Sequence, residues 1–331
     1  MKLICVTFII LLYSCNKVDN IPFDQCTAPT TNKKVGPVMM SINTESYPVK
    51  NPFYFPNNNN LFLYRKITDP PKGYVMCQYD FSSKITTPLF SSSYIFNDYC
   101  INKNGLIYLS TGFELFFMSL DNLFPQYDLS EKNRNPIFNQ EGNKLFYEHT
   151  NDNISSPFYG ESYIFCQDLV TNQVDTVRIT DMAYGSISKE DNLYFSFISP
   201  ASQNKLKYSI GRVKTSFPYD FELIREFDDY TPRSITCNKQ DENLLYFTEN
   251  VSGVIIELNI ATKSLKNLTQ KCSAYGYEEI SCSPDGKNLL ATKRYYKCLY
   301  DAEGRVSPYY QYDYSIVKFS LSTYTDEVVI P

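Results

Sequence analysis

Histidine is nearly missing from this 331-residue sequence, which contains a single residue of that type, His149. Zinc sites, Ser-His-Asp triads and histidine proton relays need partners that one histidine does not supply. His149 follows an alternating apolar segment, where a hydrogen-bonded structural or surface role is expected. Tryptophan is absent altogether, so the aromatic content comes from 29 Tyr and 23 Phe. Such side chains suit half-buried pleated surfaces and favour an all-β fold.

Other motifs that carry chemistry are also missing. The chain has no Gly-x-Ser-x-Gly elbow, no phosphate-cradling glycine loop and no Cys-x-x-Cys pair. Its net charge is only −5 and no basic block occurs, which makes nucleic acid a poor partner. We therefore expect neither a cofactor nor a bound metal. Paired carboxylates remain open as a catalytic device, with Asp228-Asp229, Glu278-Glu279 and Asp301-x-Glu303 as candidates.

The amino terminus reads as an export signal. Residues 1–14 combine Lys2, a short apolar run and a small residue before Cys15. The segment 12–15 resembles a bacterial lipobox, which predicts acylation of Cys15 and attachment to a membrane, while an ordinary cleaved signal is the alternative. Residues 15–35 then form the lipidated cysteine and a polar tether, and residues 36–331 the folded body. A eukaryotic secreted origin, to which the Asn run 57–60 points, is a further alternative.

One unit recurs six times along the body. Its clearest copy, residues 279–290, is a short strand, a Ser-Pro-Asp-Gly-Lys turn and an apolar strand, and each copy precedes a second hairpin. A four-stranded sheet with two apolar faces is not stable alone, so neighbouring sheets must stack and close into a ring. The sequence therefore predicts an all-β, six-bladed β-propeller of four-stranded antiparallel blades. The expected blades are approximately 51–97, 98–134, 135–184, 185–232, 233–277 and 278–331, and residues 36–43 are an additional candidate strand for closing the ring.

The turn at residues 283–287, preceded by Leu258-Asn259 and by Leu268-Thr269, resembles the repeat of TolB-like six-bladed propellers. Only the last blade keeps the motif intact, and the resemblance spans nearly the whole body. It implies a periplasmic or surface-exposed binding propeller in which the motif is a structural turn. The Asp boxes of sialidase propellers require Trp and are excluded.

Ten cysteines in an exported chain invite a disulfide framework. The repeat argues otherwise, because Cys237 and Cys282 take the position of Ile101, Phe138 and Ile187 in other blades. We expect these two cysteines to be small apolar core residues. A single disulfide elsewhere stays possible at this point.

A closed propeller scaffold leaves its ligands to the loops. Four of the six loops that enter the innermost strands contain Tyr, and a further insertion at 294–314 is rich in it. Because Tyr offers rigid area and a hydroxyl, these loops predict a recognition face, with chance composition as the alternative. The candidate binding residues are Tyr99, Arg134, Tyr184, Tyr230, Arg233, Tyr275, Tyr277 and Glu278.

The sequence thus favours a non-enzymatic binding or scaffolding lipoprotein of the bacterial cell envelope, on the periplasmic side or the cell surface. Its expected partners are an envelope protein or a saccharide, besides the membrane. The alternative is a carbohydrate-active propeller that uses loop carboxylates. A central funnel plugged by Phe and Ile side chains, with aromatics only at its rim, would favour binding. Two loop carboxylates about 5 to 10 Å apart that face an open central pocket would favour catalysis.

Overall fold

The computed structural model describes residues 49–331, except for residues 57, 69–72, 93–95, 97, 112–113, 130–132, 158, 201–205, 273–274 and 301–305. The predicted signal segment, the lipidation site Cys15, the tether and the extra strand at 36–43 all lie outside these residues, and so does Asp301-x-Glu303. Within them, no helix is long and apolar enough to cross a membrane.

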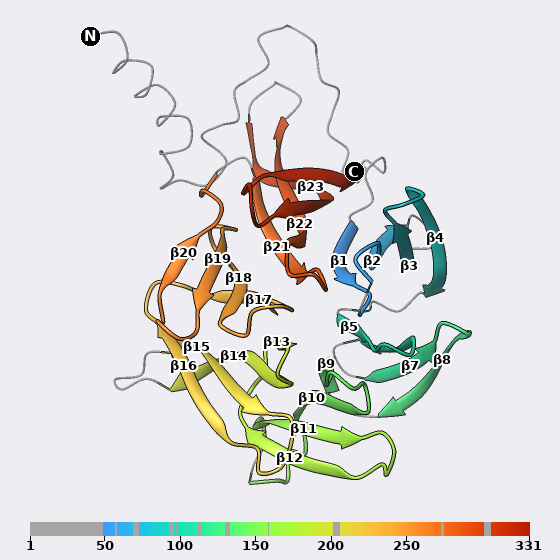
Figure 1. Ribbon diagram of the computed structural model, residues 1–331, viewed down its shortest axis with the longest axis vertical. Helices are drawn as coiled ribbons and strands as arrows, with labels where there is room; N and C mark the ends of the chain where they lie inside the picture. Colours follow the sequence, from blue (N-terminus) through green and yellow to red (C-terminus); the bar gives the residue numbers. More distant parts are fainter. Residues whose placement is uncertain are drawn as a thin grey trace, which may run out of the picture.

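Six four-stranded antiparallel sheets stand around a central axis, which confirms the predicted propeller (Figure 1). Blade 1 holds β1 (Val49–Tyr54), β2 (Leu61–Thr68), β3 (Gly73–Asp80) and β4 (Ile85–Ser92), and blade 2 holds β5 (Asp98–Ile101), β6 (Leu106–Ser110), β7 (Leu115–Ser119) and β8 (Asn122–Leu129). Blade 3 holds β9 (Asn133–Phe138), β10 (Lys144–Thr150), β11 (Ser162–Asp168) and β12 (Val174–Ile179), and blade 4 holds β13 (Tyr184–Ile187), β14 (Asn192–Pro200), β15 (Leu206–Lys214) and β16 (Phe221–Phe227). Blade 5 holds β17 (Pro232–Cys237), β18 (Leu244–Glu249), β19 (Ile255–Asn259) and β20 (Leu265–Asn267), and blade 6 holds β21 (Tyr275–Cys282), β22 (Asn288–Tyr300), β23 (Val306–Ser320) and β24 (Asp326–Ile330).

The turn between the first two strands explains why the repeat survives the loss of its motif. In blade 6, the Ser283 hydroxyl accepts from Asn288 N, and Gly286 takes φ +68°. In blades 2, 3 and 5 an asparagine replaces that serine, and its side-chain oxygen accepts from backbone amides of the same turn. Asn and Ser both close turns in this way, so Pro-Asp is dispensable. Gly286 itself is not, because a Cβ there would lie 2.4 Å from the Asn238 side chain of the neighbouring blade.

Buried apolar side chains of the described residues form six clusters, and each cluster spans one interface between adjacent blades. The ring closes through the same kind of contact. Tyr54 and Phe62 of blade 1 pack in one cluster with Leu290 and Ile316 of blade 6. Every sheet consists of consecutive strands, so no described strand is exchanged between the first and last blades. Contacts between blades, and not a shared strand of the described residues, therefore hold the closure.

Hydrogen bonds from a backbone amide to a hydroxyl of the preceding blade join the innermost strands at three of the six blade interfaces. The hydroxyls of Ser186, Thr236 and Ser281 each accept from a backbone amide of the next blade, at 3.0–3.2 Å. The last of these bonds joins blade 6 to Tyr54 of blade 1 and so crosses the closure. Each such bond contributes about 1 kcal/mol of stability. Blades 1 to 3 carry Phe53, Cys100 and Ile137 at the corresponding position, as the paired registers show.

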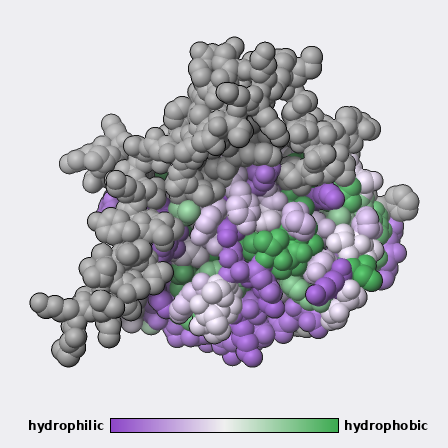
Figure 2. All heavy atoms as spheres, turned by 90° about the horizontal axis from the view of Figure 1, so that it is seen from above, coloured by the Kyte–Doolittle hydropathy of each residue, from purple (hydrophilic) through white to green (hydrophobic). Residues whose placement is uncertain are grey.

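The outer strands give the ring its solvent-facing rim. The side chains of β4 are mostly exposed, with little alternation between exposed and partly buried positions. In β12 every second or third residue is exposed. Figure 2 shows the molecule edge-on, with hydrophilic residues around a small apolar area on the visible rim. Isolated apolar side chains such as Ile85 and Ile179 are exposed there, which is ordinary for a protein surface and marks no site.

The cysteine prediction is confirmed for the residues that the structure describes. Cys237 and Cys282 are buried in the apolar clusters on either side of blade 5. Each precedes its turn by one residue, as Ile101, Phe138 and Ile187 do. Six described cysteines are free thiols, so no disulfide joins them.

Candidate ligand-binding site

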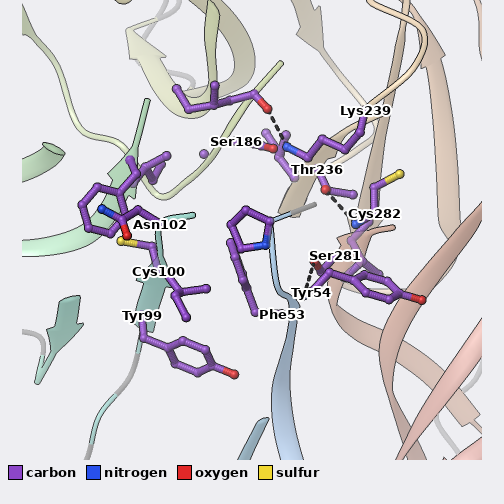
Figure 3. Close-up of a pocket in the computed structure, with 18 of the residues that line it drawn as sticks. Phe53, Tyr54, Tyr99, Cys100, Asn102, Ser186, Thr236, Lys239, Ser281 and Cys282 are labelled. Carbon is purple, nitrogen blue, oxygen red and sulfur yellow. Dashed lines mark hydrogen bonds between the residues drawn. The ribbon is translucent and has the colours of Figure 1, made fainter. Parts of the chain in front are cut away.

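A cavity of about 460 Å³ lies on the axis of the ring. All six innermost strands line it, and Figure 3 shows their side chains around the central space. The volume is within the range of small-molecule sites, about 300–1,000 Å³. The funnel is therefore open, although Phe53 and Ile137 form part of its wall.

The turn hydrogen bonds align the six innermost strands residue by residue. Four positions before the first turn residue, every blade places one side chain in the cavity wall: Asn51, Asp98, Asn135, Tyr184, Ser234 and Glu279. We call this set the entry ring, because the chain enters each blade there. Asn51 and Asn135 have φ of 54° and 55° beside bulges of β1 and β9, a conformation that asparagine tolerates better than most residues. The entry ring is thus polar in every blade.

Glu278 is a buried carboxylate directly beside the entry ring, with only 4% of its side chain exposed. Three cations from three blades surround it. Arg294 Nη1 lies 2.7 Å from Oε1, Lys50 Nζ lies 3.3 Å from Oε2, and Arg233 Nη1 lies 3.6 Å from Oε1. Arg233 also lies 3.5 Å from Glu279. Burial lowers the pKa of Arg233, but the carboxylates of Glu278 and Glu279 outweigh it and raise that pKa above its ordinary value.

A second buried carboxylate, Glu148 of β10, lies on the opposite side of the mouth. Arg134 binds it through two nitrogens, at 2.9 Å and 2.6 Å. Asn135 of the entry ring donates to Glu148 Oε2 at 3.2 Å and also to the Met182 carbonyl. Such bidentate pairing fixes both partners. Arg134 therefore orients Glu148, and Glu148 in turn fixes the Asn135 side chain in the cavity wall.

Asp98 is the entry-ring carboxylate with an altered proton affinity. Burial raises its pKa to about 6, while Arg65 lowers it and Glu279 raises it further. Glu279 shares the ring, and its Oε2 is buried without a hydrogen-bond partner among the described residues. A protonated Asp98 would present a donor, and the Glu279 carboxyl oxygens would present acceptors, to the same ligand.

The predicted binding residues divide into three groups. Tyr99 and Tyr184 line the cavity. Arg134, Arg233 and Glu278 stand one residue before the entry ring and hold it in place. The other three lie away from the cavity wall.

These three tyrosines make contacts with other residues of the fold. Tyr230 packs edge-on against Phe227 at 6.3 Å. Tyr277 is buried and donates to Asp326 at 3.0 Å. The Tyr275 ring lies 4.0 Å from Lys293 Nζ. Tyrosine content alone thus did not separate packing residues from cavity residues.

Several contributors escaped the sequence reasoning. Lys50, Arg65 and Glu148 supply charge to the mouth from β1, β2 and β10. Aligning the six repeats would have singled out Arg65 and Glu148. Where Arg65 and Glu148 stand, the other four blades carry Ser110, Ser196, Thr248 and Thr292, which are all buried.

No group of histidine, cysteine and carboxylate side chains in the described part of the chain could hold a metal ion. His149 has the structural role expected of it. Its Nδ1 lies 3.0 Å from Asn133 Oδ1, and its ring stacks on Phe165. Among the sequence-derived carboxylate pairs, Asp228 is an exposed partner of Lys207 at 3.0 Å.

A TolB structure from Agrobacterium tumefaciens resembles this architecture, with a TM-score of 0.59 and 13% sequence identity over 76% of this chain and 86% of that one. The fold is that of TolB-like six-bladed propellers. No protein-family model and no curated protein matches the sequence.

Two further structures show the same fold. The calcium-binding protein regucalcin from Agrobacterium tumefaciens has a TM-score of 0.53 at 10% identity, over 75% of this chain and 82% of that one. The propeller domain of the Trilobed protease from Pyrococcus furiosus, described as an open velcro topology, has a TM-score of 0.54 at 9% identity, over 87% and 99%. Identities this low establish the fold and not the ligand.

Proposed function

We propose that this chain is a non-enzymatic binding propeller of the bacterial cell envelope that takes a polar ligand, best a saccharide, at the entry ring. One observation carries the proposal: every blade contributes a polar side chain at one level of an open axial cavity. Amide, hydroxyl and carboxyl groups in a ring match a polyhydroxylated ligand, which offers donors and acceptors on all sides. A folded partner protein would touch only the rim, where the charges are already paired.

Tyr184 gives the sharpest test, because Tyr230 is its matched control. Both tyrosines pack against the same apolar cluster, yet only Tyr184 lines the cavity. Isothermal titration of the full-length protein with a panel of neutral and amino sugars and cell-wall glycan fragments should find a ligand. Tyr184→Ala should weaken it by about tenfold or more, equivalent to 1.4 kcal/mol, and Tyr230→Ala should leave it unchanged. No binding by any glycan, or equal loss in both variants, contradicts the proposal.

The envelope assignment rests on Cys15 and is tested separately. Metabolic palmitate labelling of the full chain should mark the protein, and Cys15→Ala should abolish the label. An unlabelled but exported protein would replace the anchor with simple secretion.

Asp98 supports a second candidate, a carbohydrate-active enzyme. Its pKa of about 6 suits a general acid, and Glu279 lines the same cavity. A glycan that is bound and cleaved by the wild type, but bound and left intact by Asp98→Asn, would favour this candidate over pure binding. A ligand recovered unchanged from both proteins would favour binding.

A further inference from the structure

The far end of the axial cavity carries three lysines at one level. Five positions beyond the entry ring, just after the first turn residue, the blades place Pro56, Lys103, Gln140, Lys189, Lys239 and Pro284, and all six line the cavity. At about 3.3 Å per residue, this level lies about 17 Å from the entry ring along the strands. We call Lys103, Lys189 and Lys239 the lysine triad. Figure 3 shows the Lys239 ammonium directed at the Ile187 carbonyl of the neighbouring blade.

No carboxylate of the described residues forms an ion pair with the triad. None of the three lysines takes part in an ion pair with a described residue. Lys239 Nζ donates to the Ile187 carbonyl at 2.6 Å, which leaves two of its three donors. Lys103 and Lys189 are exposed.

The carboxylates nearby in the sequence are engaged by the turns. Glu242 accepts from the Ser188 hydroxyl at 2.6 Å and from Glu190 N at 3.1 Å. Asp191 accepts from Gln140 N at 2.7 Å, and Asp285 accepts from Lys287 N at 3.1 Å. Glu242 and Asp191 thus tie turns of neighbouring blades together, and Asp285 stabilises its own turn.

Three like charges around one opening, none of them in an ion pair with a described residue, repel each other and attract anions, because low-dielectric walls focus the field. We propose that the lysine triad binds the anionic group of a small ligand, either a phosphate or a carboxylate. This site is separate from the entry ring and does not depend on what the entry ring binds. The remaining ammonium donors of the triad would supply the hydrogen bonds.

The test titrates the full-length protein at low ionic strength with inorganic phosphate and with glucuronate, using glucose as the neutral control. Binding should be seen for one or both anions and not for glucose. Phosphate alone would identify a phosphate-bearing ligand, glucuronate alone a carboxylate, and both the shared anionic chemistry. No binding of either anion overturns the proposal.

A triple variant, Lys103→Gln, Lys189→Gln and Lys239→Gln, should lose about tenfold or more in affinity. Its matched control removes the same net charge from exposed lysines outside the cavity, through Lys84→Gln, Lys271→Gln and Lys287→Gln. The control should change affinity less than about twofold, which is about 0.4 kcal/mol. Equal losses in the two triples would show a general charge effect and contradict the site.

Two measurements keep this test independent. Circular dichroism should show that both triples are folded. Tyr184→Ala should retain anion binding, because Tyr184 belongs to the entry ring. Anion binding that disappears with Tyr184→Ala would place the anion at the entry ring and overturn the assignment to the triad.

Discussion

The two ends of the axial cavity differ in how their charged side chains are paired. At the entry end, five cations meet five acids: Lys50, Arg65, Arg134, Arg233 and Arg294 with Asp98, Glu148, Glu278, Glu279 and Asp181, whose charge helps to raise the pKa of Arg134. At the far end, three lysines form no ion pair with an acid in the described part of the chain, and the acids there accept hydrogen bonds within the turns. Charges at the entry end therefore contribute to folding, whereas those at the far end remain available to a ligand.

Among the variants considered, Glu278→Gln should lower the free energy of unfolding most. The change removes the one anion that three partly buried cations share, and it leaves them repelling each other. Removing one partner of a buried ion pair typically costs about 3–5 kcal/mol, and we expect about 3 because each cation keeps some contact with water. Urea denaturation measures the loss.

An exposed ion pair provides the control for Glu278. Asp228 pairs with Lys207 on the surface, with 78% of the Asp228 side chain exposed. Asp228→Asn should change the free energy of unfolding by less than about 0.5 kcal/mol. Similar losses for both substitutions would mean that the network at Glu278 is no stronger than a surface pair.

Glu148→Gln, also at the entry end, should lower the free energy of unfolding less than Glu278→Gln does. Glu148 is fully buried, but 46% of its partner, the Arg134 side chain, is exposed and can turn into solvent. The glutamine also still accepts a hydrogen bond. We expect a loss of about 2 kcal/mol by urea denaturation. A loss larger than that of Glu278→Gln would reverse the proposed order.

The fold was predictable because its signals are local and repeated. Each turn needs only an Asn or Ser that accepts from nearby amides, so residues such as Asn238 and Ser283 mark blades after Pro-Asp is lost. The apolar position before each turn likewise identified Cys237 and Cys282 as core residues. Repetition allowed weak local evidence to be summed over six units.

The site was only partly predictable, because its contacts cross the ring. Lys50 and Glu278 are 228 residues apart and meet only after the first and last blades close. Bulges in β1, β9, β17 and β21 shift the strand starts, so spacing from the repeat does not give the facing residue there. The entering loops were inspected for tyrosine, whereas Asp98 and Glu279 act through their place in the entry ring.

Asp98→Asn should change how the free energy of unfolding depends on pH. Burial raises the pKa of Asp98 from 3.8 to about 6, so the folded state binds this proton more tightly than the unfolded state. Stability from Asp98 is thus present below about pH 4 and is lost as pH rises through about 6. Relative to wild type, the free energy of unfolding of the variant should rise by about 1 kcal/mol between pH 4 and pH 8. This is less than the full pKa shift would give, because Asp98 is partly open to the cavity. A difference that does not vary with pH would contradict this account.

The lysine triad should show the smallest effect on stability, and its sign should be opposite to that of Glu278. Neutralising Lys103, Lys189 and Lys239 relieves repulsion and breaks no ion pair among the described residues, although the donor to Ile187 becomes a glutamine amide. We expect the triple glutamine variant to be within about 0.5 kcal/mol of wild type in 1 M salt and slightly more stable in 10 mM salt. Thermal unfolding at the two salt concentrations measures this. Marked destabilisation at both would mean that the lysines hold the ring together, and the contrast between the two ends would then be lost.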